Sequence, residues 1–215
     1  MSKLYDCANG VALFTQRKIA RLQRSYVGKG PDAAAARGSL ARLRRLGMPG
    51  GTSWIAVGED LFEGFSDLDL SGIEEKRALN AITAALRLFA YHQQSKTTPM
   101  AIVRVDEEED AARHSFGWSC RRIEFDNDKA KGIRRRMAAI EGTRDIDGAE
   151  HHMRSLVMLM RDKNVRIDYY LLTRDLFLLQ FPHAREDVFI RWGKDYFTTK
   201  PDKTADASTD VSDAE

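Results

Sequence analysis

Apolar residues recur at helical spacing along almost the whole chain, and this periodicity constrains the fold more than any other feature. In the first segment, residues 4–26, the side chains of Val11, Ile19 and Leu22 fall on one face of a helix. No alternation of apolar and polar residues continues long enough to predict a sheet. The sequence therefore predicts an all-α fold.

Glycine, proline and capping residues divide the first half of this pattern into separate helices. Pro31 suits the first turn of a second helix that continues to about Leu46. Residues 47–70 begin with a glycine-rich stretch and predict a long connection with one helical turn. Ser71 and Glu74 then form a capping box, which predicts a helix that ends near Gln94.

The second half repeats the same arrangement of caps and helices. Asp147 and Glu150 have the spacing of another capping box. Asp168 is the predicted cap of a helix that Pro182 ends. The helices predicted here span residues 115–125, 129–141, 169–181 and 186–197, and a further helix after Asp147 has its core face at Met153, Leu156, Val157 and Met160.

The chain is therefore expected to form two small helical bundles joined by a loop. We place the N-terminal bundle at residues 1–105 and the C-terminal bundle at residues 115–197. Residues 106–114 form an acidic loop between them. The polar, acidic tail at residues 198–215 is expected to be disordered.

The distribution of charge is more informative than the net charge of +2. The tail from Thr198 to Glu215 holds five acidic and two basic residues, so the rest of the chain has 32 basic and 27 acidic residues. Arginine outnumbers lysine 23 to 11. The planar guanidinium group matches phosphate oxygens well, so this excess favours contact with nucleic-acid backbone. A genome rich in arginine codons would give the same excess.

The remaining composition is typical of a globular protein of the cytoplasm. The two cysteines, Cys7 and Cys120, form neither a disulfide framework nor a metal-binding motif. No apolar run approaches the roughly 18 residues that a membrane span requires, and the first residues do not resemble a signal peptide. We therefore expect a cytoplasmic location and no membrane partner.

Catalytic and cofactor-binding motifs are weak. His151 and His152 are adjacent and point to different helix faces, so they do not easily bind one metal ion. The glycines at residues 28–30 and 47–51 lack the spacing of a phosphate-binding loop. We expect no enzymatic activity, no cofactor and no metal site.

The basic clusters are the stronger candidates for a binding site. Arginines mounted on helices can hold backbone phosphates without reading bases. Acidic neighbours such as Glu124, Asp126 and Asp128 could instead neutralise part of the set. The candidate nucleic-acid-binding residues are Arg42, Arg44, Arg45, Arg121, Arg122, Arg135, Arg136, Arg144 and Arg154.

Several segments, taken in order, resemble the CasB family, the small subunit of the type I-E CRISPR surveillance complex Cascade. Residues 37–45 resemble the R-x-x-LA-x-LRR segment of that family, and residues 84–94 resemble its helix ending in HQ. Similar matches are the turn Ser115-Phe116-Gly117, the pair Arg135-Arg136, residues 167–176 and the closing segment at residues 191–197. Together they cover nearly the whole chain apart from the tail.

This resemblance implies a non-enzymatic helical subunit that lies in Cascade beside a second copy of itself. It would support the hybrid of guide RNA and target DNA and give the displaced DNA strand a basic path. Arg44, Arg45, Arg135 and Arg136 match the nucleic-acid-facing arginines of the family best, and Arg154 matches more loosely.

Two departures from the family pattern limit this assignment. Trp118 stands where relatives often carry an arginine after the turn, so a phosphate contact there would depend on Arg121 or Arg122. The acidic cluster at residues 106–110 would repel a strand and should lie away from the binding face.

Two other function classes stay open. A freestanding helix-turn-helix regulator would use residues 28–31 as its turn and would protect a discrete DNA sequence. A small helical hydrolase or nuclease would use His151, His152 and Asp168 with a metal ion.

Overall fold

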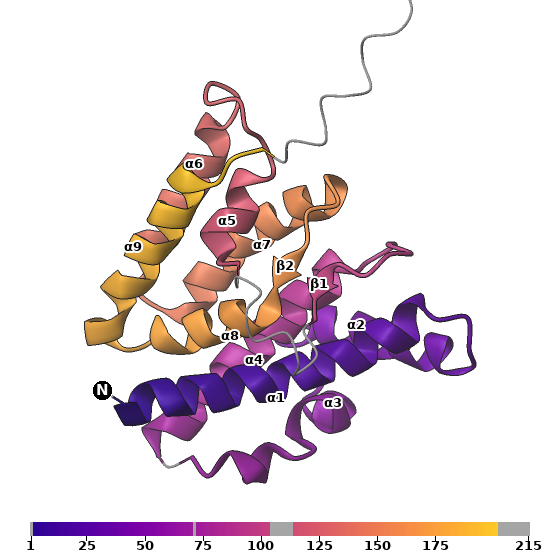
Figure 1. The fold of residues 1–215 in the computed structure, drawn as a ribbon. Helices are drawn as coiled ribbons and strands as arrows, with labels where there is room; N and C mark the ends of the chain where they lie inside the picture. Colours follow the sequence, from indigo (N-terminus) through magenta and orange to yellow (C-terminus); the bar gives the residue numbers. More distant parts are fainter. Residues whose placement is uncertain (1, 71, 104–113, 202–215) are drawn as a thin grey trace, which may run out of the picture.

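The computed structural model describes residues 2–70, 72–103 and 114–201, and these residues are mainly helical (Figure 1). This confirms the predicted all-α fold. The acidic cluster at residues 106–110 and most of the predicted disordered tail lie outside the described residues. The helices are α1 (Ser2–Val27), α2 (Asp32–Arg45), α3 (Gly58–Phe62), α4 (Ile73–His92), α5 (Phe116–Arg121), α6 (Lys131–Glu141), α7 (Ile146–Asp162), α8 (Tyr169–Leu178) and α9 (Pro182–Thr198).

The helix α4 lies at the centre of the fold because it is apolar on nearly every side. Residues 81–86 are all buried, which is typical of a helix that other helices surround. The neighbours of α4 are α1 and α2 from the first half of the chain, and α7 and α8 from the second half.

The helices of the two predicted bundles share one apolar cluster. The helix α8 packs on both α1 and α4, and α7 packs on α4 and α6. Buried residues from both halves, among them Ile19, Phe89, Met153 and Leu172, belong to the same cluster. Contacts between the halves are therefore part of the core.

Two very short strands also join the halves. The strand β1 (Ala101–Ile102) pairs in parallel with β2 (Ile167–Asp168). Gln23 of α1 fixes the start of β1, because its side chain accepts a hydrogen bond from Ala101 N (2.7 Å) and donates one to Ala101 O (3.2 Å). The pair is too short to produce the alternation that predicts a sheet.

Three local predictions were wrong. Asp145, and not Asp147, caps α7, because its Oδ1 accepts a hydrogen bond from Gly148 N (2.8 Å). The helix α8 ends at Leu178, and Pro182 begins the next helix instead of only ending the previous one. The connection at residues 47–70 contains α3 and two 3₁₀ turns, η1 (Ile55–Val57) and η2 (Phe65–Leu68).

Two other capping predictions have different outcomes. Asp168 caps α8 as predicted, since its Oδ1 accepts a hydrogen bond from Leu171 N (3.2 Å). Ser71, the predicted cap of α4, lies outside the described residues, and Gly72 precedes the helix with a positive φ of 51°.

The helices α5 and α9 cross closely at a glycine. A Cβ atom on Gly117 would lie 1.9 Å from the carbonyl oxygen of Trp192, so no other residue fits without a shift of the backbone. The Trp192 indole in turn donates a hydrogen bond to the buried Asp175 carboxylate (2.6 Å). This contact holds α9 on α8.

Candidate nucleic-acid interface

The last turn of α2 carries three of the predicted phosphate-binding arginines. Arg42 donates a hydrogen bond to Ser39 Oγ (3.0 Å) and lies 4.0 Å from the carboxylate of Asp60. Arg45 is exposed and donates a hydrogen bond to the carbonyl of Gly50 (3.4 Å). An acid therefore partly neutralises Arg42, whereas Arg45 forms no ion pair with the described residues and bonds to a neutral group.

The third of these arginines, Arg44, ties α2 to α4. Its Nη1 donates a hydrogen bond to Ala90 O (3.0 Å), and its own carbonyl accepts one from the Tyr91 hydroxyl (3.1 Å). Burial lowers the pKa of the Arg44 guanidinium. The ordinary pKa of arginine is so high that the side chain still carries its charge at neutral pH.

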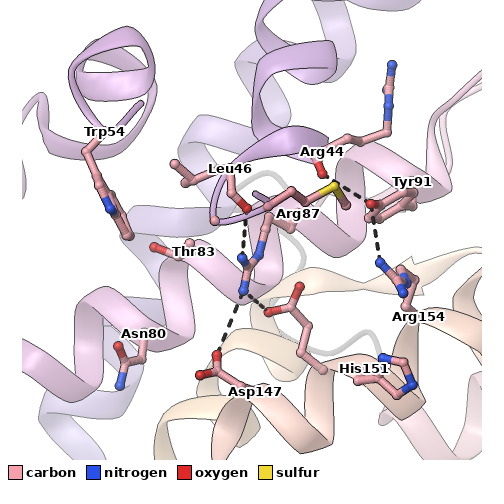
Figure 2. Close-up of a pocket in the computed structure, with 13 residues that line it drawn as sticks. Arg44, Leu46, Trp54, Asn80, Thr83, Arg87, Tyr91, Asp147, His151 and Arg154 are labelled. Carbon is pink, nitrogen blue, oxygen red and sulfur yellow. Dashed lines mark hydrogen bonds and ion pairs between the residues drawn. The ribbon is translucent and has the colours of Figure 1, made fainter. Parts of the chain in front are cut away.

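A pocket of about 470 Å³ opens between the residues that follow α2 and the helices α4 and α7 (Figure 2). We call it the crevice pocket, and its walls include Trp54, Thr83, Arg87, Tyr91, His151 and Arg154. Arg44 also lines it, so the fold brings together two predicted arginines, Arg44 and Arg154, from opposite halves of the chain.

Arg87 stands in the middle of the crevice pocket and is neutralised there (Figure 2). Its guanidinium bonds to the carboxylate of Glu150, lies 4.0 Å from Asp147 and donates a hydrogen bond to Leu46 O (3.0 Å). Burial raises the pKa of Glu150, and the neighbouring Arg87 opposes that change. This ion pair joins α4, α7 and the end of α2.

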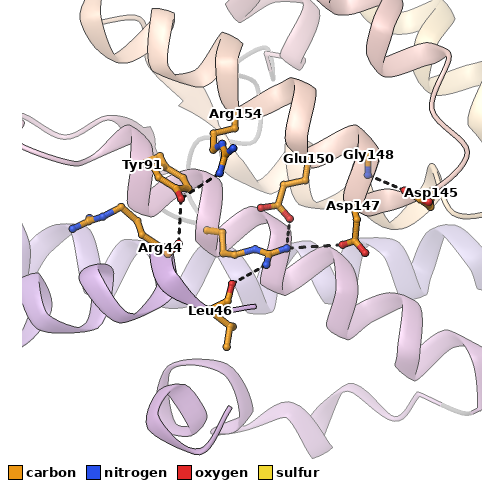
Figure 3. A network of polar contacts seen from close by, with 9 residues as sticks. Arg44, Leu46, Tyr91, Asp145, Asp147, Gly148, Glu150 and Arg154 are labelled. Atoms are coloured by element: carbon orange, nitrogen blue, oxygen red, sulfur yellow. Dashed lines mark hydrogen bonds and ion pairs between the residues drawn. The ribbon is translucent and has the colours of Figure 1, made fainter. Parts of the chain in front are cut away.

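Arg154 of α7 lies at the end of the crevice pocket that is farther from Trp54 (Figure 2). Its Nη1 lies 3.5 Å from the Tyr91 hydroxyl, and its guanidinium carbon lies 5.4 Å from the centre of the Tyr91 ring. Figure 3 shows this contact beside Glu150 and Asp147. No acid pairs with Arg154 among the residues that the structure describes.

A second pocket, of about 430 Å³, adjoins the first and is lined by four cations. Asn80 lines both pockets. The cations are Lys76, Arg77, Arg144 and Arg185, of which only Arg144 was predicted. Arg144 is exposed, whereas Arg185 donates hydrogen bonds to backbone carbonyls, among them Thr143 O (2.7 Å).

The two arginines that follow Trp118 pack on aromatic rings. Arg121 donates a hydrogen bond to Phe125 O (2.9 Å), and its guanidinium lies 5.5 Å from the centre of the Tyr196 ring. Arg122 lies 4.7 Å from the centre of the Trp118 ring. Both are half-buried, so much of their surface is used inside the protein.

The helix α6 presents its arginines differently. Arg135 and Arg136 are exposed, and within the described part of the chain Arg136 donates a hydrogen bond only to a backbone carbonyl, Gly132 O (3.1 Å). Two acids that precede α6 pair with lysines: Asp126 lies 3.5 Å from Lys129, and Asp128 lies 2.9 Å from Lys131.

Sequence reasoning missed Arg77, Arg87 and Arg185, which also lie in the two pockets. Arg87 carried a usable signal, because a charged residue inside the apolar stretch at residues 84–90 must find a partner. Its partner, Glu150, lies 63 residues away in the chain, and helical periodicity cannot predict such a pairing.

The three residues of the predicted hydrolase site lie in different surroundings. His151 lines the crevice pocket, while Asp168 is buried as the cap of α8. Within the described ranges, no group of three His, Cys, Asp or Glu side chains could hold a metal ion. His92 is fully buried, and its Nε2 lies 2.9 Å from Val165 O.

Comparison with known families decides the assignment. Residues 39–197 match the family model described as CRISPR-associated protein Cse2. The chain belongs to the Cse2 family. This confirms the predicted resemblance and supports a role as a subunit of a CRISPR Cascade complex.

A solved structure agrees with membership in the Cse2 family. The crystal structure of CasB from Thermobifida fusca matches with a TM-score of 0.72 and 24% sequence identity. The match covers 87% of this chain and 97% of that one, so the two share a fold. A search of curated proteins found no match. No helix among the described residues is long and apolar enough to cross a membrane.

Proposed function

We propose that this Cse2-family chain is a non-catalytic Cascade subunit that binds the sugar-phosphate backbone of nucleic acid in antiviral defence. Its partners would be guide RNA, the target and displaced DNA strands, the other Cascade subunits and a second copy of itself. It would supply charge and shape, while base pairing by the guide carries sequence, a division of labour known from another CRISPR effector.

The exposed arginines of α6 are the main observation that supports this proposal. Arg135 and Arg136 are mounted on a regular helix, and the nearby Asp126 and Asp128 are held by lysines. Their charge is therefore available to phosphate groups, which release condensed counterions when they bind a protein cation. Arg45 and Arg144 are also exposed and extend the proposed surface onto α2 and the start of α7.

The other candidate arginines have a smaller part in the proposal. Arg42 lies near the acid Asp60, and Arg121 and Arg122 pack on aromatic rings. Arg44 and Arg154 lie at the crevice pocket, where each could reach a phosphate at its edge. We assign the first three to structure and Arg44 and Arg154 to a secondary contact.

The test is the salt dependence of binding to labelled single strands of DNA and RNA. For the double variant Arg135→Ala/Arg136→Ala, the slope of log affinity against log salt should become flatter by about 1.4, since each lost single-strand contact contributes roughly 0.7. The matched control is Asp128→Ala/Lys131→Ala, which removes an exposed ion pair of the same region and leaves the net charge of that region unchanged. This control should change the slope by much less.

Three results would contradict the proposal. An unchanged slope in the α6 variant would remove the site assignment. A discrete protected sequence in footprinting would favour a helix-turn-helix regulator instead. Cleavage of the labelled strands with Mg²⁺ or Mn²⁺, by protein free of contaminating nuclease, would show that the subunit is an enzyme.

A further inference from the structure

The crevice pocket has a chemical character that differs from the basic surfaces around it. Trp54 lies at one end, and Tyr91 and Arg154 lie at the other, with Arg87 between them (Figure 2). The volume of about 470 Å³ lies within the range of roughly 300–1,000 Å³ that small organic groups occupy in proteins. A nucleotide needs an aromatic surface for its base and a cation for its phosphate, and the pocket offers one at each end.

Trp54 contributes little to packing within the protein itself. Its side chain is 48% exposed, and among the described residues it stacks on no other ring. Large aromatic side chains are normally buried, or they lie where a partner covers them. Exposed aromatic rings beside cations are also the usual platforms for the bases of single strands.

Thr83 supplies an independent observation from the wall of the same pocket. The residue is only 5% exposed, yet its hydroxyl has no hydrogen-bond partner among the described residues. In Figure 2 this hydroxyl points into the pocket on the side of Trp54. A buried hydroxyl without a partner is costly, so it points to a polar group that enters from outside.

The polar groups next to Thr83 favour the same kind of guest. The carboxamide of Asn80 also lines the pocket, and its Nδ2 is held by Gln180 Oε1 (3.1 Å). The Nε of Arg87 is buried without a partner among the described residues. These groups include both donors and acceptors, which suits the polar edge of a heterocyclic base.

We infer that the crevice pocket holds one unstacked nucleobase of a bound single strand, with the base against Trp54 and its edge at Thr83. This inference rests on the proposed function and adds a site to it. The phosphates on either side of the base lie toward Arg154 and the rim residue Arg44. Stacking accepts every base, so the site holds a strand in place without reading its sequence.

The experiment measures the affinity of the full-length protein for a short labelled single strand at fixed salt. Trp54→Ala should weaken binding between about 5- and 150-fold, the range observed when a stacking aromatic ring is removed. Trp54→Phe should recover most of the affinity because it restores a ring. The matched control is Ile55→Ala, since Ile55 is 91% exposed beside Trp54 and lies outside the pocket.

A second variant tests the edge contact without disturbing the fold. Thr83→Val keeps the shape of the side chain and removes a hydroxyl that the folded protein leaves unsatisfied, so the melting temperature should stay the same or rise. Affinity for the strand should nevertheless fall about 3- to 10-fold, which is the loss of one hydrogen bond. A residue with a purely structural role would not give this combination.

The outcomes distinguish this inference from the proposed function. Trp54→Ala should lower affinity without changing the salt slope, whereas loss of arginines flattens the slope. A strand of abasic residues should bind wild-type protein more weakly than a normal strand binds Trp54→Ala, because it loses the contact with Thr83 as well as the stacking on Trp54. Normal binding by Trp54→Ala would overturn the base pocket and leave the proposed function standing. Failure of wild-type protein to bind any single strand would overturn both.

Discussion

The crevice between α4 and α7 and the outer face of α6 both contain arginine, but the residue has opposite roles in the two places. Arg87 in the crevice is 20% exposed and is paired with Glu150, which is 10% exposed. Arg135 and Arg136 on α6 are exposed, and their acidic neighbours are paired with lysines. The number of arginines in a sequence therefore measures neither the charge of a surface nor its affinity for phosphate.

The difference follows from how each helix is placed. The helix α7 is covered by α4 on one side and by α6 on another, so a charge on its inner face must find a partner of opposite sign. The helix α6 contributes few residues to the core, chiefly Ile133 and Ile140 with Met137 packed beside them, and Arg135 and Arg136 face solvent. Arginines on such a helix are free to bind a ligand.

This comparison predicts that substitution of Arg87 causes the largest loss of stability. Arg87→Ala should lower the free energy of unfolding by about 3–5 kcal/mol, because it leaves the Glu150 carboxylate buried without its partner. Urea denaturation measures this change. Arg87→Met/Glu150→Leu should recover most of the loss, since apolar residues can replace a buried ion pair. A stability of Arg87→Ala close to that of wild type would show that the crevice arginine resembles those of α6.

A second polar group at the junction of the two halves, His92, predicts that the stability of the protein depends on pH. His92 lies between Val165 O and the Tyr169 hydroxyl, and burial lowers its pKa from 6.5 to about 3. The unfolded chain therefore binds a proton that the folded chain does not bind between these values. Stability should fall as the pH drops below about 6.5, by up to roughly 1.4 kcal/mol for each pH unit.

Asp175 affects the pH dependence of stability in the opposite direction. The test therefore compares the stability of wild-type protein with that of a His92 variant. Burial raises the pKa of Asp175 to about 6, and its contribution to stability is present below pH 3.8 and is lost as the pH rises towards 6. The two contributions partly cancel in wild-type protein. Urea denaturation of wild type and His92→Asn from pH 4.5 to 7.5 isolates the histidine. A pH-independent difference between them would contradict the prediction.

The residues that revealed the family are mostly residues that hold the fold together. Gly117 permits the close crossing of α5 and α9, Asp175 binds Trp192, and Gln93 accepts a hydrogen bond from Met100 N (3.1 Å). Such positions are recognisable in sequence because one residue type alone fits them. The helices and the family were predictable for this reason.

The pockets were not predictable, because they depend on distant segments. Periodicity indicates which face of α4 or α7 is apolar, but it does not show that Arg87 meets Glu150 or that Trp54 lies across from Thr83. The predicted cap of α7 was wrong for a more local reason. Asp145 and Asp147 are both good caps, and the position of the first helical turn decides between them.

The smallest loss of stability is expected for substitution of Arg121. This residue is intermediate between the paired arginine of the crevice and the exposed arginines of α6. Its guanidinium is half-buried, donates hydrogen bonds to Asn127 Oδ1 (3.0 Å) and Phe125 O, and lies over the Tyr196 ring. Arg121→Ala should therefore lower the free energy of unfolding by about 1 kcal/mol through lost packing and hydrogen bonding.

The same variant should leave the salt slope of nucleic-acid binding unchanged, because its charge is engaged inside the protein. Arg121→Lys keeps the charge but loses the planar contact with the ring, so it should be destabilised to a similar extent. Urea denaturation and salt-dependent binding measured on the same samples check both points. If Arg121→Ala flattened the salt slope by about 0.7 at normal stability, Arg121 would belong with the phosphate-binding arginines of α6, and the basic surface would extend onto α5.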